Sequence, residues 1–214
     1  MFRTVFFDLD GTLTESGPGI MNAVRHALKK QGLPEPDETV LRRFIGPPLE
    51  ESFQKYCGMD AEQAAASIPL YREYYLPVGA YENAPYPGIP EMLKKLSALG
   101  FRLCVATAKP ETVSEEILRH FGLEPFFKAC YGVTPARTSK RSVIACALTA
   151  EKITDRSEVL MVGDRENDID GAKFNGLSSC GVLYGYGSRA ELEAAGADYI
   201  AASVNDLEKL ILTP

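Results

Sequence analysis

The sequence lacks the residue patterns of disulfide-bonded and zinc-binding proteins. Its five cysteines are odd in number and widely spaced, and none of them forms a CxxC motif. Its two histidines, His26 and His120, have no second histidine or cysteine at ligand spacing. These absences favour reduced, mostly buried thiols over a disulfide or zinc framework.

Long apolar runs and excess positive charge are also missing. No segment approaches the roughly 20 apolar residues that a helix needs to cross a bilayer, and the opening MFRTVFFDLDG turns acidic too early for a secretory signal or transit peptide. Because 23 Lys and Arg face 29 Asp and Glu, the net charge is -6. This charge disfavours a nucleic acid polymer as partner, and the lack of a long apolar segment disfavours a membrane. Together with the reduced thiols, these features predict a cytoplasmic protein, and both a monomer and a homodimer stay open.

What the chain does contain is a rhythm of short apolar runs separated by helical patterns, which is typical of a parallel α/β sheet. The runs are rich in Val, Leu and Phe without strict alternation, as in strands that are covered on both faces. We predict a doubly wound parallel sheet with a Rossmann-like core. Its six strands are expected within residues 4–9, 101–107, 128–133, 158–163, 179–184 and 197–202.

Residues 16–85 interrupt this rhythm with helical patterns and no convincing strand. The segments SGPG and NAPYPG mark the two ends of this region, because Gly and Pro punctuate the chain there. We therefore predict an all-α domain, residues 16–85, inserted into a core domain made of residues 1–15 and 86–214. Within this insertion, Pro69 should kink or divide the long helix expected at residues 60–78.

Polar residues follow the predicted strands at the edge where parallel sheets bind ligands. These residues are Asp8, Asp10, Gly11 and Thr12 after the first strand, Thr107 after the second, and Asp164 and Asp168 after the fourth; Lys140 opens a helix after the third. Three carboxylates at one sheet edge repel one another unless a cation joins them. A hard, oxygen-liganded ion such as Mg²⁺ is the simplest solution.

This set of residues has the composition that phosphoryl transfer requires. One carboxylate can act as a nucleophile while a second acts as general acid and base. The hydroxyl of Thr107 and the ammonium of Lys140 can neutralise phosphoryl oxygens, beside the backbone amides around Gly11 and Thr12. The sequence therefore favours a reaction at a small phosphate ester.

Four segments in order, DLDGTL, VATAK, Lys140 and GDRENDID, resemble the motifs of haloacid dehalogenase-like hydrolases, in the phosphatase branch that carries a helical cap. The resemblance implies that Asp8 attacks phosphorus to form an aspartyl-phosphate. It also implies that Asp10 protonates the leaving oxygen and then activates the water that hydrolyses the intermediate.

The same resemblance implies a metal site and a phosphoryl site. Asp8, the backbone carbonyl of Asp10, and Asp164 would hold Mg²⁺, with Asp168 as a nearby carboxylate. Thr107, the amide of Ala108 and Lys140 would bind the phosphoryl group. The adjacent Lys109 is an alternative to Lys140, because this motif is only a lysine at variable spacing.

Several alternatives remain at this point. Asp10 argues against a dehalogenase, which needs no acid for its leaving group, and Gly11-Thr12 favours a hydrolase over a phosphomutase. A non-catalytic binding protein is also possible. We expect a phosphoglycolate-type substrate, with a 5'-nucleotidase acting on nucleoside monophosphates as the alternative. Arg42, Arg43 and the cap tyrosines are candidates for contacts to either substrate, or for plain surface and packing roles.

Overall fold

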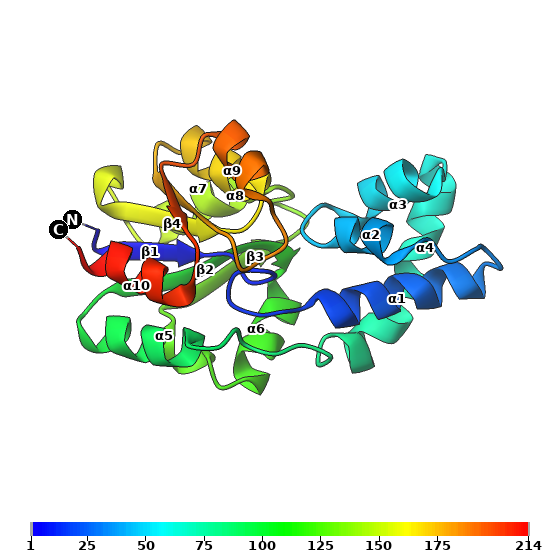
Figure 1. Cartoon of the computed structure of the whole chain (residues 1–214), viewed down its shortest axis with the longest axis horizontal. Helices are drawn as coiled ribbons and strands as arrows, with labels where there is room; N and C mark the ends of the chain where they lie inside the picture. The colour runs from blue at the N-terminus through cyan, green and yellow to red at the C-terminus, as the bar shows by residue number, and fades with distance from the viewer. Residues whose placement is uncertain (1, 214) are drawn as a thin grey trace. The chain divides into compact units, whose positions relative to one another are not determined.

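Six parallel strands form the sheet that the apolar runs predict (Figure 1). The structure is a computed structural model that describes residues 2–213. Its strands are β1 (Thr4–Phe7), β2 (Arg102–Pro110), β3 (Ala129–Val133), β4 (Val159–Gly163), β5 (Ser178–Val182) and β6 (Tyr199–Ala201). Their order is β3-β2-β1-β4-β5-β6, which confirms the doubly wound α/β fold. The order reverses between β1 and β4, where such sheets bind ligands.

Two layers of helices cover the sheet (Figure 1). One face carries α7 (Lys140–Ala150), α8 (Glu166–Phe174) and α9 (Arg189–Ala195). The other face carries α5 (Ile89–Ala98), α6 (Glu111–His120) and α10 (Val204–Leu212). Short 3₁₀ turns, η3 (Glu124–Phe126) and η4 (Arg156–Glu158), precede β3 and β4. The strands are therefore covered on both sides, which explains why their apolar residues do not alternate with polar ones.

The central strand β1 is completely buried. Phe6 belongs to an apolar cluster with Val143 of α7 and Met161 of β4. Phe7 contacts the ring of Phe127 edge-on, with ring centroids 6.2 Å apart. Burial of a side chain of this size contributes about 1.5–3 kcal/mol. The end of β1 is therefore held firmly, and so are the polar residues that follow it.

The chain separates into two compact units: residues up to Thr14 together with those from Pro85, and Glu15–Ala84. The second unit contains α1 (Gly17–Lys30), α2 (Glu38–Leu41), η1 (Arg42–Phe44), α3 (Leu49–Cys57), α4 (Ala61–Tyr74) and the π-helical turn η2 (Tyr75–Gly79). Of the two outcomes expected at Pro69, a kink or a division, the division does not occur, because α4 continues through the proline. Buried residues on both sides of the proline, Ser67 and Tyr71, hold the helix in place, and the α-helix ends only after Tyr74.

The two chain segments that connect these units lie side by side. Thr14 and Pro85 form an antiparallel bridge, and the amide of Glu15 donates to the carbonyl of Ala84 over 2.8 Å. The amide of Tyr86 then donates to the carbonyl of Leu13.

In the described part of the chain, none of the helices has the length and apolar character that crossing a bilayer requires.

Candidate active site

The first two aspartates are placed by the end of β1. The amide of Asp8 still donates to the carbonyl of Val162 in β4, so Asp8 continues the line of the strand. Asp8 is buried, Leu9 is fully enclosed in the core, and Asp10 is half-buried. Because side chains alternate along an extended chain, Leu9 can pack inside while the two carboxylates share the opposite side.

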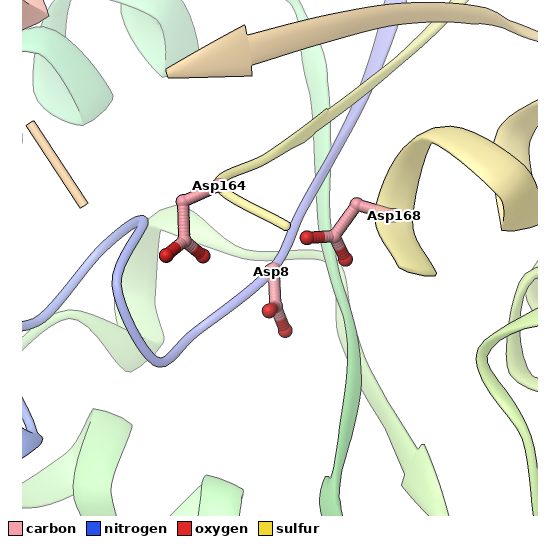
Figure 2. Close-up of side chains that lie close together, drawn as sticks. All are labelled: Asp8, Asp164 and Asp168. Atoms are coloured by element: carbon pink, nitrogen blue, oxygen red, sulfur yellow. The ribbon is translucent and has the colours of Figure 1, made fainter. Parts of the chain in front are cut away.

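Three carboxylates meet where β1 and β4 end (Figure 2). Each of Asp8, Asp164 and Asp168 offers one oxygen, and these oxygens lie within 4.8 Å of one another. Asp164 follows β4 directly, and Asp168 lies in the first turn of α8. All three are buried. The fold thus brings Asp8 next to Asp164 and Asp168, although more than 150 residues separate Asp8 from either of them in the sequence.

Lys140 lies between two of these carboxylates. It is the first residue of α7, whose N-terminus is capped by Ser139, and its side chain is buried. Its Nζ is 2.7 Å from Oδ1 of Asp8 and 2.7 Å from Oδ1 of Asp168. Burial lowers the pKa of Lys140, but the two carboxylates outweigh burial and hold the pKa above its usual value. The lysine therefore stays charged.

Asp164 has no comparable cation. Its Oδ2 accepts the amide of Tyr186 over 2.8 Å, and its Oδ1 lies 3.4 Å from the hydroxyl of Thr12. Among residues 2–213 it forms no ion pair. Burial and the neighbouring Asp168 and Asp8 raise the pKa of Asp164 well above the usual value. Burial likewise raises the pKa of Asp168, to about 6, although Lys140 opposes the shift.

This arrangement fits a divalent cation. Of the three buried carboxylates, Asp8 and Asp168 pair with the buried Lys140, and Asp164 does not. The raised pKa values of Asp164 and Asp168 indicate that the negative charge there is only partly compensated. The donor set consists of oxygens, which are the ligands that hard cations prefer. The structure therefore contains a cluster of three aspartates that could bind a metal ion. The side chain of Asp10 is not part of that cluster, and a contribution from its backbone carbonyl stays a prediction.

Asp10 is paired with the second lysine. Nζ of Lys109 lies 2.6 Å from Oδ2 of Asp10, and both side chains are largely buried. Oδ1 of Asp10 is buried and has no hydrogen-bond partner within the described residues. One oxygen of Asp10 is thus anchored by Lys109, while the other has no hydrogen-bond partner among the described residues. The two lysines that the sequence could not separate therefore lie at different carboxylates.

The groups expected to donate hydrogen bonds to a phosphoryl group differ in burial and in the hydrogen bonds that they already make. Thr107 is buried in β2, and its Oγ1 accepts the amide of Lys109 over 3.2 Å, while Ala108 is half-buried. The amide of Gly11 donates to the carbonyl of Thr14. The amide of Thr12 donates to the carbonyl of Leu9, so both of these amides are already engaged within the turn after β1.

The loop after β5 is a part of the site that sequence reasoning missed. A Cβ on Gly185 would lie 2.4 Å from Cβ of Asp164, and one on Gly187 would lie 1.8 Å from the carbonyl oxygen of Asp164. Between these glycines, Tyr186 supplies the amide that binds Asp164. The letters YGYGS after an apolar run were the available signal, because alternating glycines often mark a close backbone approach.

The residues of the helical unit that were candidates for substrate contacts have partners of their own. Arg42 forms an exposed ion pair with Glu38 at 2.9 Å, and the guanidinium of Arg43 lies 5.9 Å from the ring centroid of Tyr56. The rings of Tyr71 and Tyr75 stack at 5.1 Å. Arg42 thus forms a surface ion pair, and the aromatic rings pack against Arg43 or against each other.

Known proteins resemble this chain along nearly its whole length. A family model described as haloacid dehalogenase-like hydrolase matches residues 5–182. A 5'-nucleotidase of Pseudomonas aeruginosa is 40% identical over 98% of this chain and 96% of that protein. A tyrosine-protein kinase of Mycobacterium tuberculosis is 37% identical over 98% and 72%, and a phosphoglycolate phosphatase of Caulobacter vibrioides is 34% identical over 98% and 91%. The crystal structure of a predicted phosphatase from Clostridium acetobutylicum superposes with a TM-score of 0.94, 43% identity and 99% coverage of both chains.

Proposed function

The chain belongs to the haloacid dehalogenase-like hydrolase family and is a phosphatase of that family, and we propose that it is a Mg²⁺-dependent phosphomonoester hydrolase that works through an aspartyl-phosphate. One observation carries this proposal. The buried cluster of Asp8, Asp164, Asp168 and Lys140 lies next to a separately anchored Asp10, so nucleophile and acid can act side by side.

In the proposed reaction, an oxygen of Asp8 attacks phosphorus and the bond to the leaving oxygen breaks. Asp10 gives a proton to that oxygen through its unanchored Oδ1, and then takes a proton from the water that hydrolyses the intermediate. Lys109 holds the other oxygen of Asp10 in place during both steps. The phosphoryl group leaves as inorganic phosphate, and Asp8 is regenerated.

Asp8, Asp164 and Asp168 are the side chains that would hold Mg²⁺, which when bound supplies positive charge to offset the carboxylates and the phosphoryl oxygens. Lys140, fixed at the nucleophile, is our candidate for the side chain that neutralises a phosphoryl oxygen, and the hydroxyl of Thr107 is a second donor. We assign the helical unit Glu15–Ala84 the role of a cap domain that selects substrates and excludes water.

Two substrate classes have support from the relatives. The 5'-nucleotidase is the more similar of the two phosphatases, so nucleoside 5'-monophosphates are the first substrates to test. Phosphoglycolate is the second candidate, because a relative with that name also aligns over nearly the whole chain. The kcat/KM values for a panel of both classes would rank them directly.

The test of the mechanism is phosphate release from an aryl phosphate and from the panel, with and without a chelator. Asp8→Asn and Asp10→Asn should abolish turnover, and Asp170→Asn is the matched control, because Asp170 is an exposed aspartate of α8 paired with Arg141. Activity in the Asp8→Asn protein, or in excess chelator, would disprove the mechanism. Transfer of the phosphoryl group to an added alcohol or tyrosine peptide in preference to water would instead assign the chain to the phosphotransferases.

A further inference from the structure

We propose that Glu191 is a positioning residue that, through Arg165, fixes the segment carrying Asp164 and Asp168 in the geometry that binds the metal ion. This inference rests on the metal site of the proposed function. Neither Glu191 nor Arg165 belongs to the three-carboxylate cluster. Glu191 lies outside the sequence motifs, and Arg165 lies within the segment GDRENDID but receives no role from it.

The need for such a device follows from where the two carboxylates lie. Asp164 directly follows β4, whereas Asp168 belongs to the first turn of α8. Their separation is therefore set by the short connection between strand and helix. Within that connection, the amide of Arg165 donates to Oδ2 of Asp168 over 3.1 Å, so the backbone of Arg165 already determines where one carboxylate lies.

Glu191 holds this connection from the neighbouring helix. Its Oε1 accepts Nε of Arg165 over 2.8 Å and also the amide of Glu166 over 3.0 Å. One carboxylate oxygen thus binds both a side chain and a backbone group of the same connection. The side chains of Arg165 and Glu191 are only 18% and 22% exposed, so this ion pair is better shielded from solvent than an ordinary surface pair.

Glu191 is itself held by the loop that contacts Asp164. Its amide donates to Oγ of Ser188, which begins α9. The residues just before Ser188 include Tyr186, whose amide binds the carboxylate of Asp164, and Gly187, which packs against its backbone. The segment from Tyr186 to Glu191 therefore contacts the β4–α8 connection at both of its ends, at Asp164 and at Glu166.

Repulsion within the cluster is the reason why the contact between Glu191 and the β4–α8 connection matters. The three carboxylates offer oxygens that lie within 4.8 Å of one another, so their like charges repel. A contact that holds the connection from outside opposes the separation of Asp164 and Asp168 that this repulsion favours. Outer partners that orient metal ligands typically change metal affinity by about 10–100-fold when they are removed.

The variants follow from this geometry. Glu191→Gln keeps an oxygen that can accept the amide of Glu166 but removes the charge that pairs with Arg165. Glu193→Gln is the matched control, since Glu193 lies on the same helix and pairs with Arg189 in an exposed contact at 3.1 Å. Arg165→Gln and the double variant with Glu191→Gln complete a cycle.

The first measurement is binding of Mn²⁺ to the metal-free proteins by electron paramagnetic resonance, with Mg²⁺ as competitor. We expect Glu191→Gln and Arg165→Gln each to weaken Mn²⁺ binding by about tenfold or more. The double variant should bind Mn²⁺ no more weakly than the weaker-binding single variant. Glu193→Gln should bind Mn²⁺ with the affinity of the wild type. Equal Mn²⁺ affinity in Glu191→Gln and wild type, or losses that add in the double variant, would overturn the positioning role.

The second measurement does not need the metal. Hydrogen exchange in the metal-free proteins should show faster exchange of amides 164–168 in Glu191→Gln than in wild type and Glu193→Gln. Unchanged exchange there would overturn the positioning role even if the metal site is correct. The opposite outcome is also informative. If the wild type binds no Mn²⁺, but amides 164–168 still exchange faster in Glu191→Gln than in the wild type, the metal site is overturned and the contact between Glu191 and the connection is supported.

Discussion

Replacement of Asp168 by asparagine should make the metal-free protein more stable at pH 8, although it removes a residue of the proposed site. In the folded chain burial raises the pKa of Asp168 to about 6, from an ordinary value of 3.8. Because the folded state binds this proton more tightly than the unfolded state, the free energy of unfolding falls as pH rises through that window. A shift of about two pH units corresponds to roughly 3 kcal/mol lost by pH 8.

Asparagine resembles the protonated carboxyl and has no charge to lose. The Asp168→Asn protein should therefore escape this loss, and its advantage should grow from near zero at pH 4 to at most roughly 3 kcal/mol at pH 8. The ion pair with Lys140 does not reverse the sign, because the lysine's attraction is already included in a pKa that remains raised.

The assay is urea-induced unfolding in chelator across pH 4–8, for wild type and variant. Asp170→Asn is the control, because Asp170 is exposed and lies on the same helix. Excess Mg²⁺ should stabilise the wild type and narrow the gap, since a bound cation removes the cost of the ionised carboxylate. A variant that is less stable than the wild type at pH 8, or a difference that does not depend on pH, would refute this reasoning.

Three further predictions concern other parts of the core. Lys140→Met should cost about 3–5 kcal/mol of stability in chelator and clearly less in excess Mg²⁺, because it leaves two buried carboxylates without their shared partner; equal losses in urea unfolding under both conditions would contradict this. Gly187→Ala should lower kcat/KM by roughly 100-fold, since its Cβ would force the loop away from Asp164, and unchanged kinetics would show that the loop is not needed. A disulfide-forming thiol reagent at pH 8 should modify Cys104 and Cys180 much faster in denatured than in folded protein, because both are buried and burial raises the pKa of each thiol to about 12. Rapid reaction of these two cysteines in the folded state would contradict their burial.

The sheet could be predicted from the sequence because strands buried on both faces must be apolar throughout, and short apolar runs of this kind are easily recognised. Element ends were harder. β2 was expected to stop at Thr107 but extends to Pro110, because it pairs with Val133 of β3 beyond a shift in register. Such a shift depends on the partner strand, which local patterns do not contain.

In the site, the residues that could be predicted are those whose side chains carry the chemistry and follow a strand, such as Asp8 and Asp164. Sequence alone could not tell Lys109 from Lys140, because the choice depends on how β2 and α7 lie around β1. Residues that act through the backbone, such as Gly187, or through a partner more than twenty positions away, such as Glu191, leave only weak signals in the sequence.

The paired segments at the two ends of residues 15–84 make this insertion an exchangeable module. Because Thr14 and Pro85 are already bridged, and Glu15 is hydrogen-bonded to Ala84, the core needs only a short turn to close its chain if the insertion is removed. Loop-closure entropy rises slowly with length, by about 0.6 kcal/mol for each doubling. Insertions of very different size can therefore begin and end at these same two residues, so a lineage can exchange the helical unit by recombination without redesigning the sheet.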